Sequence, residues 1–187
     1  MVSFFGLVIR IFAGSWGRRP GRDTRSVESR TETLNALAIT SGEVAGEVLW
    51  VLDGDTVDVR IEGCTVRVRL DSIDCPEDGQ PWGNTAKAGL IKMIGRKPVL
   101  LEVHGVDDYG RMLATVFARH GPEGKLTNVN ERMVMLGHAW VLRGYCAHLP
   151  RERQKQLFRL ETWARSKKVG LWRTPDPVPP WKWRWGQ

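Results

Sequence analysis

The chain has 187 residues, a length that suits one compact domain with tails rather than two domains. Its 28 Lys and Arg outnumber its 21 Asp and Glu, and the formal net charge of +7 favours a polyanionic partner, either nucleic acid or an anionic membrane surface. The cysteines, Cys64, Cys75 and Cys146, form no CxxC pair, which argues against a disulfide scaffold and a structural zinc site.

The first 42 residues differ in composition from the rest. Residues 2–13 are mostly apolar but contain Arg10, and they are too short to span a bilayer core of about 30 Å. No basic residue precedes them, so they do not form a clean secretory signal peptide. Residues 17–33 are polar and aperiodic, as in a flexible linker. We therefore expect residues 1–42 to be a flexible or weakly apolar leader, in preference to a cleaved signal, and to be dispensable for folding and catalysis.

Short runs rich in Val, Leu and Ile follow the leader and alternate apolar with polar side chains, which is typical of half-buried strands. Five such runs predict strands at residues 46–52, 56–61, 64–70, 99–104 and 112–119. Gly63 provides a hairpin turn between the second and third runs, and residues 107–110 form a tight turn between the last two.

Three helices are expected between and after these strands. Asn84 is predicted to cap a helix that ends at Gly95, and Asn128 to cap a second one. Pro150 is predicted to open a third helix that ends before Gly170. Short strands interrupted and followed by helices predict an α+β fold, mainly β, in which an OB-type five-stranded barrel is capped by three helices.

Carboxylates gather after the first and third predicted strands, with Asp53 and Asp55 in one loop and Asp74 and Glu77 in the other. Polar turns alone would explain either loop, because Asp-Gly is common turn chemistry. Carboxylate oxygens that converge from two neighbouring loops would instead need a hard cation between them. An EF-hand is excluded because its twelfth position, counted from Asp53, is Cys64 and not a bidentate Glu.

Arg69 ends the third predicted strand, and Arg111 follows the turn after the fourth. A guanidinium suits phosphate because its planar fork donates two hydrogen bonds and stays charged, although a single Arg is more often a solvated or ion-paired surface residue. Two acidic loops and two arginines together indicate phosphoryl transfer. The alternatives are a non-catalytic nucleic-acid-binding OB module, which should lack these acids or arginines, and a membrane-surface protein.

Four blocks stand in one order: residues 51–56, residues 69–77, residues 107–114 and residues 130–139. They read VLDGDT, RLDSIDCPE, DDYGRMLA and NERMVMLGHA. In this order and spacing they resemble the staphylococcal nuclease (thermonuclease) family, in its bacterial branch, over about residues 43–173. The resemblance implies a metal-dependent endonuclease that uses one calcium ion to hydrolyse DNA and RNA and leaves 3′-phosphate ends.

The resemblance also implies a role for each matching position. Asp55 and Asp74 match the calcium-binding carboxylates, and Cys75 matches a ligand that offers its backbone carbonyl. Asp53 matches a nearby acid that supports the metal through water. Glu77 matches the proposed general base.

Arg69 and Arg111 match the phosphate-clamping arginines of the family. Tyr109, Tyr145 and Arg143 fall at positions that contact substrate, where a buried barrel tyrosine is an equally good reading of each Tyr. Arg143 replaces a nucleoside-contacting tyrosine, so base preference does not carry over. The implied partners are DNA and RNA, with no obligate protein partner and a monomeric state. Secretion or the cell envelope is common in the family, but the leader does not decide the location.

Residues 174–187 form a Pro/Trp-rich tail. Its tryptophans, with Trp172 just before it and cations between them, could stack on bases or lie at a membrane surface. Packing against the barrel is favoured because each indole buries a large apolar area. The histidines, His104, His120, His138 and His148, share no metal-ligand spacing, and only the Cys146-Ala147-His148 run suggests one.

Overall fold

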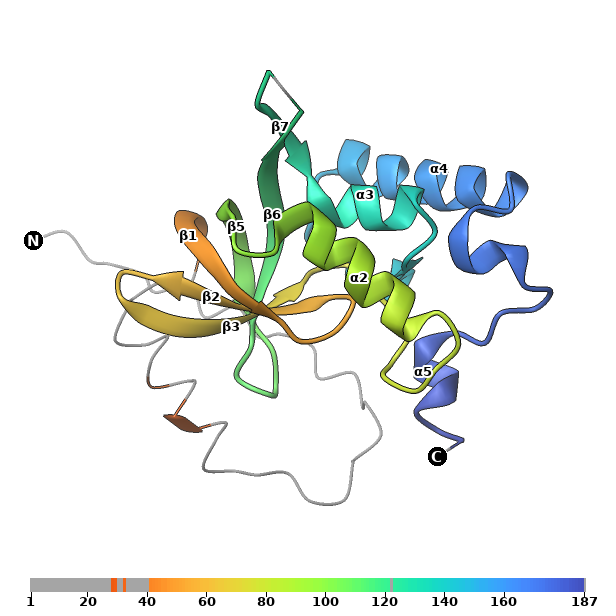
Figure 1. Ribbon diagram of the computed structural model, residues 1–187, viewed down its shortest axis with the longest axis horizontal. Helices are drawn as coiled ribbons and strands as arrows, with labels where there is room; N and C mark the ends of the chain where they lie inside the picture. Colours follow the sequence, from red (N-terminus) through yellow and green to blue (C-terminus); the bar gives the residue numbers. More distant parts are fainter. Residues whose placement is uncertain (1–27, 30–31, 33–40, 122, 187) are drawn as a thin grey trace, which may run out of the picture.

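The structure is a computed structural model, and it describes residues 28–29, 32, 41–121 and 123–186 (Figure 1). Nearly all of the expected leader lies outside the described residues, so its dispensability stays a prediction. In the described part of the chain, no helix is both long and apolar enough to cross a membrane.

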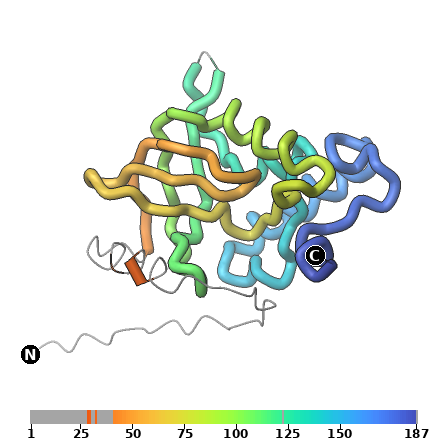
Figure 2. The backbone as a smooth tube through the Cα atoms, turned by 60° about the horizontal axis from the view of Figure 1, so that its bottom comes forward, coloured from red at the N-terminus to blue at the C-terminus, as the bar shows by residue number. Residues whose placement is uncertain are grey.

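Five strands form a closed barrel (Figures 1 and 2). They are β1 (Gly42–Val51), β2 (Thr56–Ile61), β3 (Cys64–Leu70), β5 (Pro98–Val106) and β6 (Met112–His120). Antiparallel pairing in the order β3-β2-β1-β5-β6 is closed by a parallel contact between β3 and β6, in which Val68 lies opposite Met112 and Leu70 opposite Ala114. The predicted OB-type five-stranded barrel is therefore confirmed.

The alternation read from the sequence fills the barrel interior. Val57, Val59 and Ile61 on β2 are fully buried, whereas the side chains between them point outward. Three strands were not predicted: β7 (Lys125–Asn128), which extends the sheet beyond β6, and the two-residue strands β4 (Ile73–Asp74) and β8 (Trp140–Val141), which pair with each other. The β4–β8 pair matters for function because it contains Asp74.

Among the described residues, three helices have seven residues or more, as expected. They are α2 (Gly83–Ile94), α3 (Val129–Met135) and α4 (Arg151–Ser166). Helices α2 and α3 pack on barrel strands, and α4 packs on α3. Shorter elements follow: the 3-10 helices η1 (Arg143–Tyr145) and η2 (Gly170–Arg173), and α5 (Pro180–Trp183). The Asn128 side chain caps α3 by accepting a hydrogen bond from the Glu131 N–H at 3.0 Å, as predicted.

The predicted cap at Asn84 is wrong. Helix α2 begins at Gly83, and its N-cap position is Trp82, two residues before Asn84, in a left-handed conformation with φ 77°. A Cβ atom on Gly83 would lie 2.1 Å from the Glu77 carbonyl oxygen. Close approach of the Glu77 loop, which the local sequence does not report, therefore sets the start of the helix.

Candidate active site

The first acidic loop folds tightly against the second. Asp53 accepts a hydrogen bond from the Asp55 N–H at 2.9 Å, an arrangement typical of an Asx turn. Between them, a Cβ atom on Gly54 would lie 2.6 Å from Cys75 Cβ and 3.0 Å from Ala86 Cβ. Only glycine allows the loop to approach the second loop and α2 this closely.

Arg69 joins the two loops. Its Nη1 atom lies 2.5 Å from Asp55 Oδ1, and its Nη2 atom donates to Asp74 Oδ1 at 2.8 Å. Asp55 and Asp74 are only 6% and 1% exposed, and Arg69 is also buried. The second oxygen of Asp55 accepts a hydrogen bond from the Cys75 N–H at 2.8 Å. Two buried carboxylates, one from the loop after β1 and one from β4, thus share one guanidinium.

Burial and mutual repulsion shape the charges of these acids. Burial and the neighbouring Asp55 raise the pKa of Asp53 to about 7. Burial also raises the pKa of Asp74, and Arg69 offsets this only in part. Burial alone would raise the pKa of Asp55, but Arg69 and the Cys75 N–H outweigh it and hold that pKa below its ordinary value.

These acids fit a hard cation by the chemistry of their donors. Asp53, Asp55 and Asp74 supply carboxylate oxygens, which calcium and magnesium prefer. A cation would also relieve the repulsion that raises the pKa of Asp53. In the described structure, guanidinium groups and backbone N–H groups use the oxygens of Asp55 and Asp74.

Glu77 lies in the loop that precedes α2. Its N–H donates to Gln80 Oε1 at 2.9 Å, and Gln80 Nε2 donates to the Val178 carbonyl at 2.7 Å. This second bond ties the loop to the C-terminal tail, and α5 lies beside the loop in Figure 1. The loop that contains the expected general base is therefore tied to a segment about 100 residues away in sequence.

Arg184 in that tail is the residue that sequence analysis missed. Its Nη2 atom donates to Asp74 Oδ2 at 2.8 Å, and its Nη1 atom donates to Glu77 Oε1. The sequence shows Arg184 as one of several cations between tryptophans, so no local signal sets it apart. The composition of the tail does not predict a contact with the acidic site.

Arg111 and Tyr109 lie on the turn between β5 and β6. Asp107 holds this turn, because its carboxylate accepts from the Tyr109 N–H at 2.9 Å and from Arg111 Nε at 2.7 Å. The Arg111 guanidinium carbon lies 5.2 Å from the centroid of the Tyr109 ring. Arg111 is near enough to Asp55 to help lower the pKa of that carboxyl group, so the turn faces the acidic loops.

Arg143 and Tyr145 lie on η1. The Arg143 guanidinium donates to the buried Glu161 at 2.9 Å and lies 4.4 Å above the Phe158 ring, so it contacts α4. Tyr145 is 44% exposed, and its carbonyl accepts a hydrogen bond from Ser72 Oγ at 3.4 Å. The expected pair of substrate contacts thus contains one Arg held by α4 and one Tyr at the surface.

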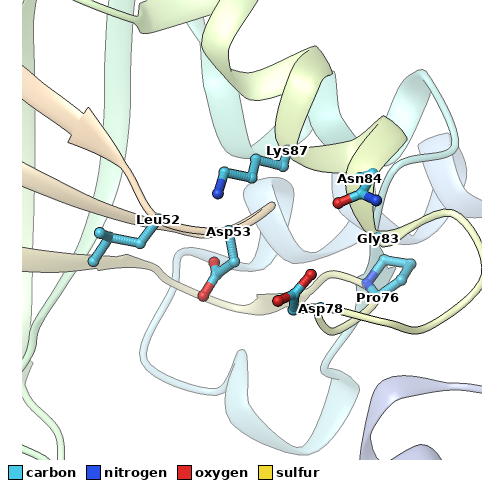
Figure 3. A pocket seen from close by; sticks show the side chains of 7 residues that line it. All are labelled: Leu52, Asp53, Pro76, Asp78, Gly83, Asn84 and Lys87. Carbon is cyan, nitrogen blue, oxygen red and sulfur yellow. The ribbon is translucent and has the colours of Figure 1, made fainter.

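A small pocket opens beside the acidic loops (Figure 3). It is lined by Leu52, Asp53, Pro76, Asp78, Gly83, Asn84 and Lys87. The carboxylates of Asp53 and Asp78 come from the two loops, and Lys87 reaches in from α2. Neither Lys87 nor Asp78 was predicted from the sequence as a site residue. Lys87 carries a positive charge and Asp78 a negative one, so the pocket presents charges of both signs.

Comparison with known proteins gives a consistent picture. A family model described as staphylococcal nuclease homologue matches residues 67–174. Protein ParB of Escherichia coli is 43% identical over 147 residues, which cover 76% of this chain and 80% of that protein. A micrococcal nuclease of Shigella flexneri is 42% identical over 142 residues, or 74% of this chain and 79% of that protein. An uncharacterized endonuclease of Escherichia coli O157:H7 is 39% identical over 146 residues, or 78% of this chain and 88% of that protein. With its barrel and these relatives, the chain belongs to the staphylococcal nuclease family.

Proposed function

We propose that this nuclease-family chain is a calcium-dependent endonuclease that hydrolyses phosphodiester bonds of DNA and RNA and leaves 3′-phosphate ends. The observation that carries the proposal is the pairing of Arg69 with both Asp55 and Asp74 in a buried site. The pairing places a guanidinium that can bind phosphate beside two carboxylates that can bind a hard cation. Phosphoryl transfer needs both kinds of group.

Asp55 and Asp74 would hold one calcium ion with the backbone carbonyl of Cys75, and Asp53 would support it through water. When bound, such an ion polarises a phosphoryl oxygen and lowers the pKa of a water molecule. Two carboxylates and one carbonyl leave several positions for water and substrate, a loose shell that calcium tolerates better than magnesium.

The remaining roles belong to the protein's own side chains. Glu77 takes the proton of the attacking water, and Arg69 and Arg111 donate hydrogen bonds to the phosphate oxygens, where charge increases in the transition state. Arg184 must release Glu77 Oε1 for this, because that oxygen accepts its hydrogen bond in the described structure. Tyr109, Tyr145 and Arg143 contact the nucleotide.

The test uses the full chain with linear DNA and RNA, in calcium, in magnesium and with excess chelator. We expect cleavage in calcium, slower cleavage in magnesium and none with chelator. The new ends should accept a label from polynucleotide kinase at the 5′ hydroxyl and resist 3′ extension until a phosphatase has removed the 3′ phosphate. The variant Glu77→Gln, purified in parallel, controls for contaminating nuclease. Binding of nucleic acid without cleavage would make the barrel a binding module, and cleavage that is equal or faster in magnesium would contradict the calcium assignment.

A further inference from the structure

A second group of metal-ligating side chains lies outside the proposed active site. Asp71 comes from the turn between β3 and β4, His104 from β5, and His148 from the loop between η1 and α4. Each offers one ligand atom, and these atoms all lie within 4.8 Å of one another. Within the described residues, no other three His, Cys, Asp or Glu meet this condition.

We propose that Asp71, His104 and His148 bind a divalent transition-metal ion, of which zinc is the most suitable probe. Imidazole nitrogen suits zinc, copper, iron and nickel, whereas calcium takes oxygen ligands. Two histidines and one carboxylate match the zinc sites that keep a fourth position open for water or substrate. The ligand set therefore selects a different class of metal from the carboxylates at Asp55 and Asp74.

Asp71 is held in place by the fold. It is 5% exposed, its N–H donates to the Ala114 carbonyl at 2.9 Å, and its own carbonyl accepts from Asn130 Nδ2 at 2.9 Å. Its carboxylate oxygen Oδ2 accepts from Ser72 Oγ at 2.6 Å. Carboxylates that bind metals are usually held by hydrogen bonds from neighbouring groups, and Asp71 is held in this way by its backbone bonds and by the Ser72 hydroxyl.

His104 is also oriented by a second residue. Its Nε2 atom lies 2.8 Å from Oγ1 of Thr115, a buried residue on β6. Metal-bound histidines usually make such a bond through the ring nitrogen that does not bind the ion.

His148 completes the group from the surface. Its Nε2 atom lies 2.8 Å from Asp71 Oδ2, its ring centroid lies 4.9 Å from that of His104, and its side chain is 41% exposed. Atoms bound to one tetrahedral zinc ion at about 2.0–2.2 Å are roughly 3.3–3.6 Å apart. A small movement of the exposed His148 ring would therefore admit the ion, and solvent provides its route of entry.

The neighbouring charges do not block the site. Arg153 is the nearby cation, and it forms an ion pair with Glu102 at 2.5 Å. A bound ion would link the β3–β4 turn, β5 and the segment before α4. The same turn leads into Asp74, so the ion would brace one wall of the proposed active site.

The test is titration of the metal-free full chain with zinc, and then with cobalt for its absorption spectrum, both in excess calcium. Excess calcium keeps the carboxylate site occupied, and the experiment needs no substrate, so it does not depend on nuclease activity. The four histidines of the chain are His104, His120, His138 and His148, so the leader contributes none. His120→Gln removes a histidine from outside the group and is the matched control.

We expect one equivalent of zinc to bind to the wild type and to His120→Gln, with a rise in melting temperature and a cobalt spectrum of tetrahedral intensity. His104→Gln and His148→Gln should each weaken binding more than about tenfold. Asp71→Asn, which keeps the shape of the side chain, should do the same. Absence of a zinc equivalent in the wild type would overturn the proposal, as would zinc affinity that survives all three substitutions. The second result would leave Asp71 and His148 as a simple ion pair.

Discussion

The guanidinium of Arg184 donates to both carboxylate oxygens of Asp74, at 2.8 Å to Oδ2 and 3.4 Å to Oδ1. The two residues are 110 positions apart in sequence. Asp74 is also an expected calcium ligand, and its oxygens cannot serve a cation and two guanidinium groups at full strength. A cation bound at Asp74 would therefore compete with Arg184 for the carboxylate oxygens.

Arg184→Ala should raise calcium affinity by about fivefold, which corresponds to the loss of an ion pair worth about 1 kcal/mol at a partly exposed site. Calorimetric titration without substrate gives this affinity. Lys182→Ala is the control, because it removes one positive charge from α5, two residues before Arg184, and leaves the bonds from Arg184 to Asp74 in place. Equal calcium affinities for Arg184→Ala and Lys182→Ala would show that the tail does not compete with the ion.

Glu77 and Arg111 should differ in what their substitution removes. Glu77→Gln keeps size and hydrogen bonding but loses the basic oxygen, so turnover should fall by about 10²–10⁴-fold while substrate binding survives. Arg111→Lys keeps the positive charge but loses the planar guanidinium, which pairs with Asp107 in the structure and would donate two hydrogen bonds to phosphate. Turnover should therefore fall. Single-turnover cleavage and binding curves on folded variants decide this. If folded Glu77→Gln and Arg111→Lys both cleaved at the wild-type rate, the catalytic roles assigned to Glu77 and Arg111 would be wrong.

Asp55 should be as important for stability as for metal binding, because it is buried and bonded to Arg69 and Cys75. Asp55→Ala leaves the Arg69 charge without one of its two partners and should cost about 3 kcal/mol of unfolding free energy. Asp58→Ala is the control, since its pair with Arg67 is more exposed and should be worth at most about 1 kcal/mol. Chemical denaturation in chelator measures both. If the two variants lose equal stability, the buried pairing does not hold the site together.

Local patterns predicted the barrel and the Asn128 cap, because both depend on neighbours in sequence. Period-2 alternation identifies strands such as β2, and one side chain can cap the helix that follows it. The start of α2 was missed because the packing of the Glu77 loop against Gly83 decides it. Arg184 and the cluster around Asp71 were missed for the same reason. Their partners lie in distant segments, and neither spacing nor composition records a contact across the fold.

His138 should make the protein sensitive to mild acid. Burial lowers its pKa from the ordinary 6.5, and its Nδ1 atom accepts a hydrogen bond from Trp82 Nε1 at 3.1 Å, which requires that nitrogen to be unprotonated. Below about pH 6.5, His138 binds a proton in the unfolded chain more readily than in the folded protein. The free energy of unfolding is therefore at its full value above that pH and decreases as the pH falls. The His138→Gln variant should lose less stability than the wild type between about pH 7.5 and pH 5. Parallel denaturation curves over this range test it, and identical pH slopes would contradict it.

Two of the three tail tryptophans should differ in effect, because Trp181 packs against the fold and Trp185 does not. Trp181 packs with its ring centroid 6.4 Å from that of the buried Trp140, whereas Trp185 is 73% exposed. Trp181→Ala should therefore cost about 1–3 kcal/mol, less than a fully buried indole because Trp181 is only partly covered. Trp185→Ala should leave the melting temperature nearly unchanged.

Melting curves and Michaelis constants on both variants separate packing from substrate stacking. A larger change in the Michaelis constant than in stability for Trp181→Ala would mean that this indole stacks on bases. Because Trp181 lies in α5, which Arg184 directly follows, the loss of its packing should also raise calcium affinity, as Arg184→Ala should.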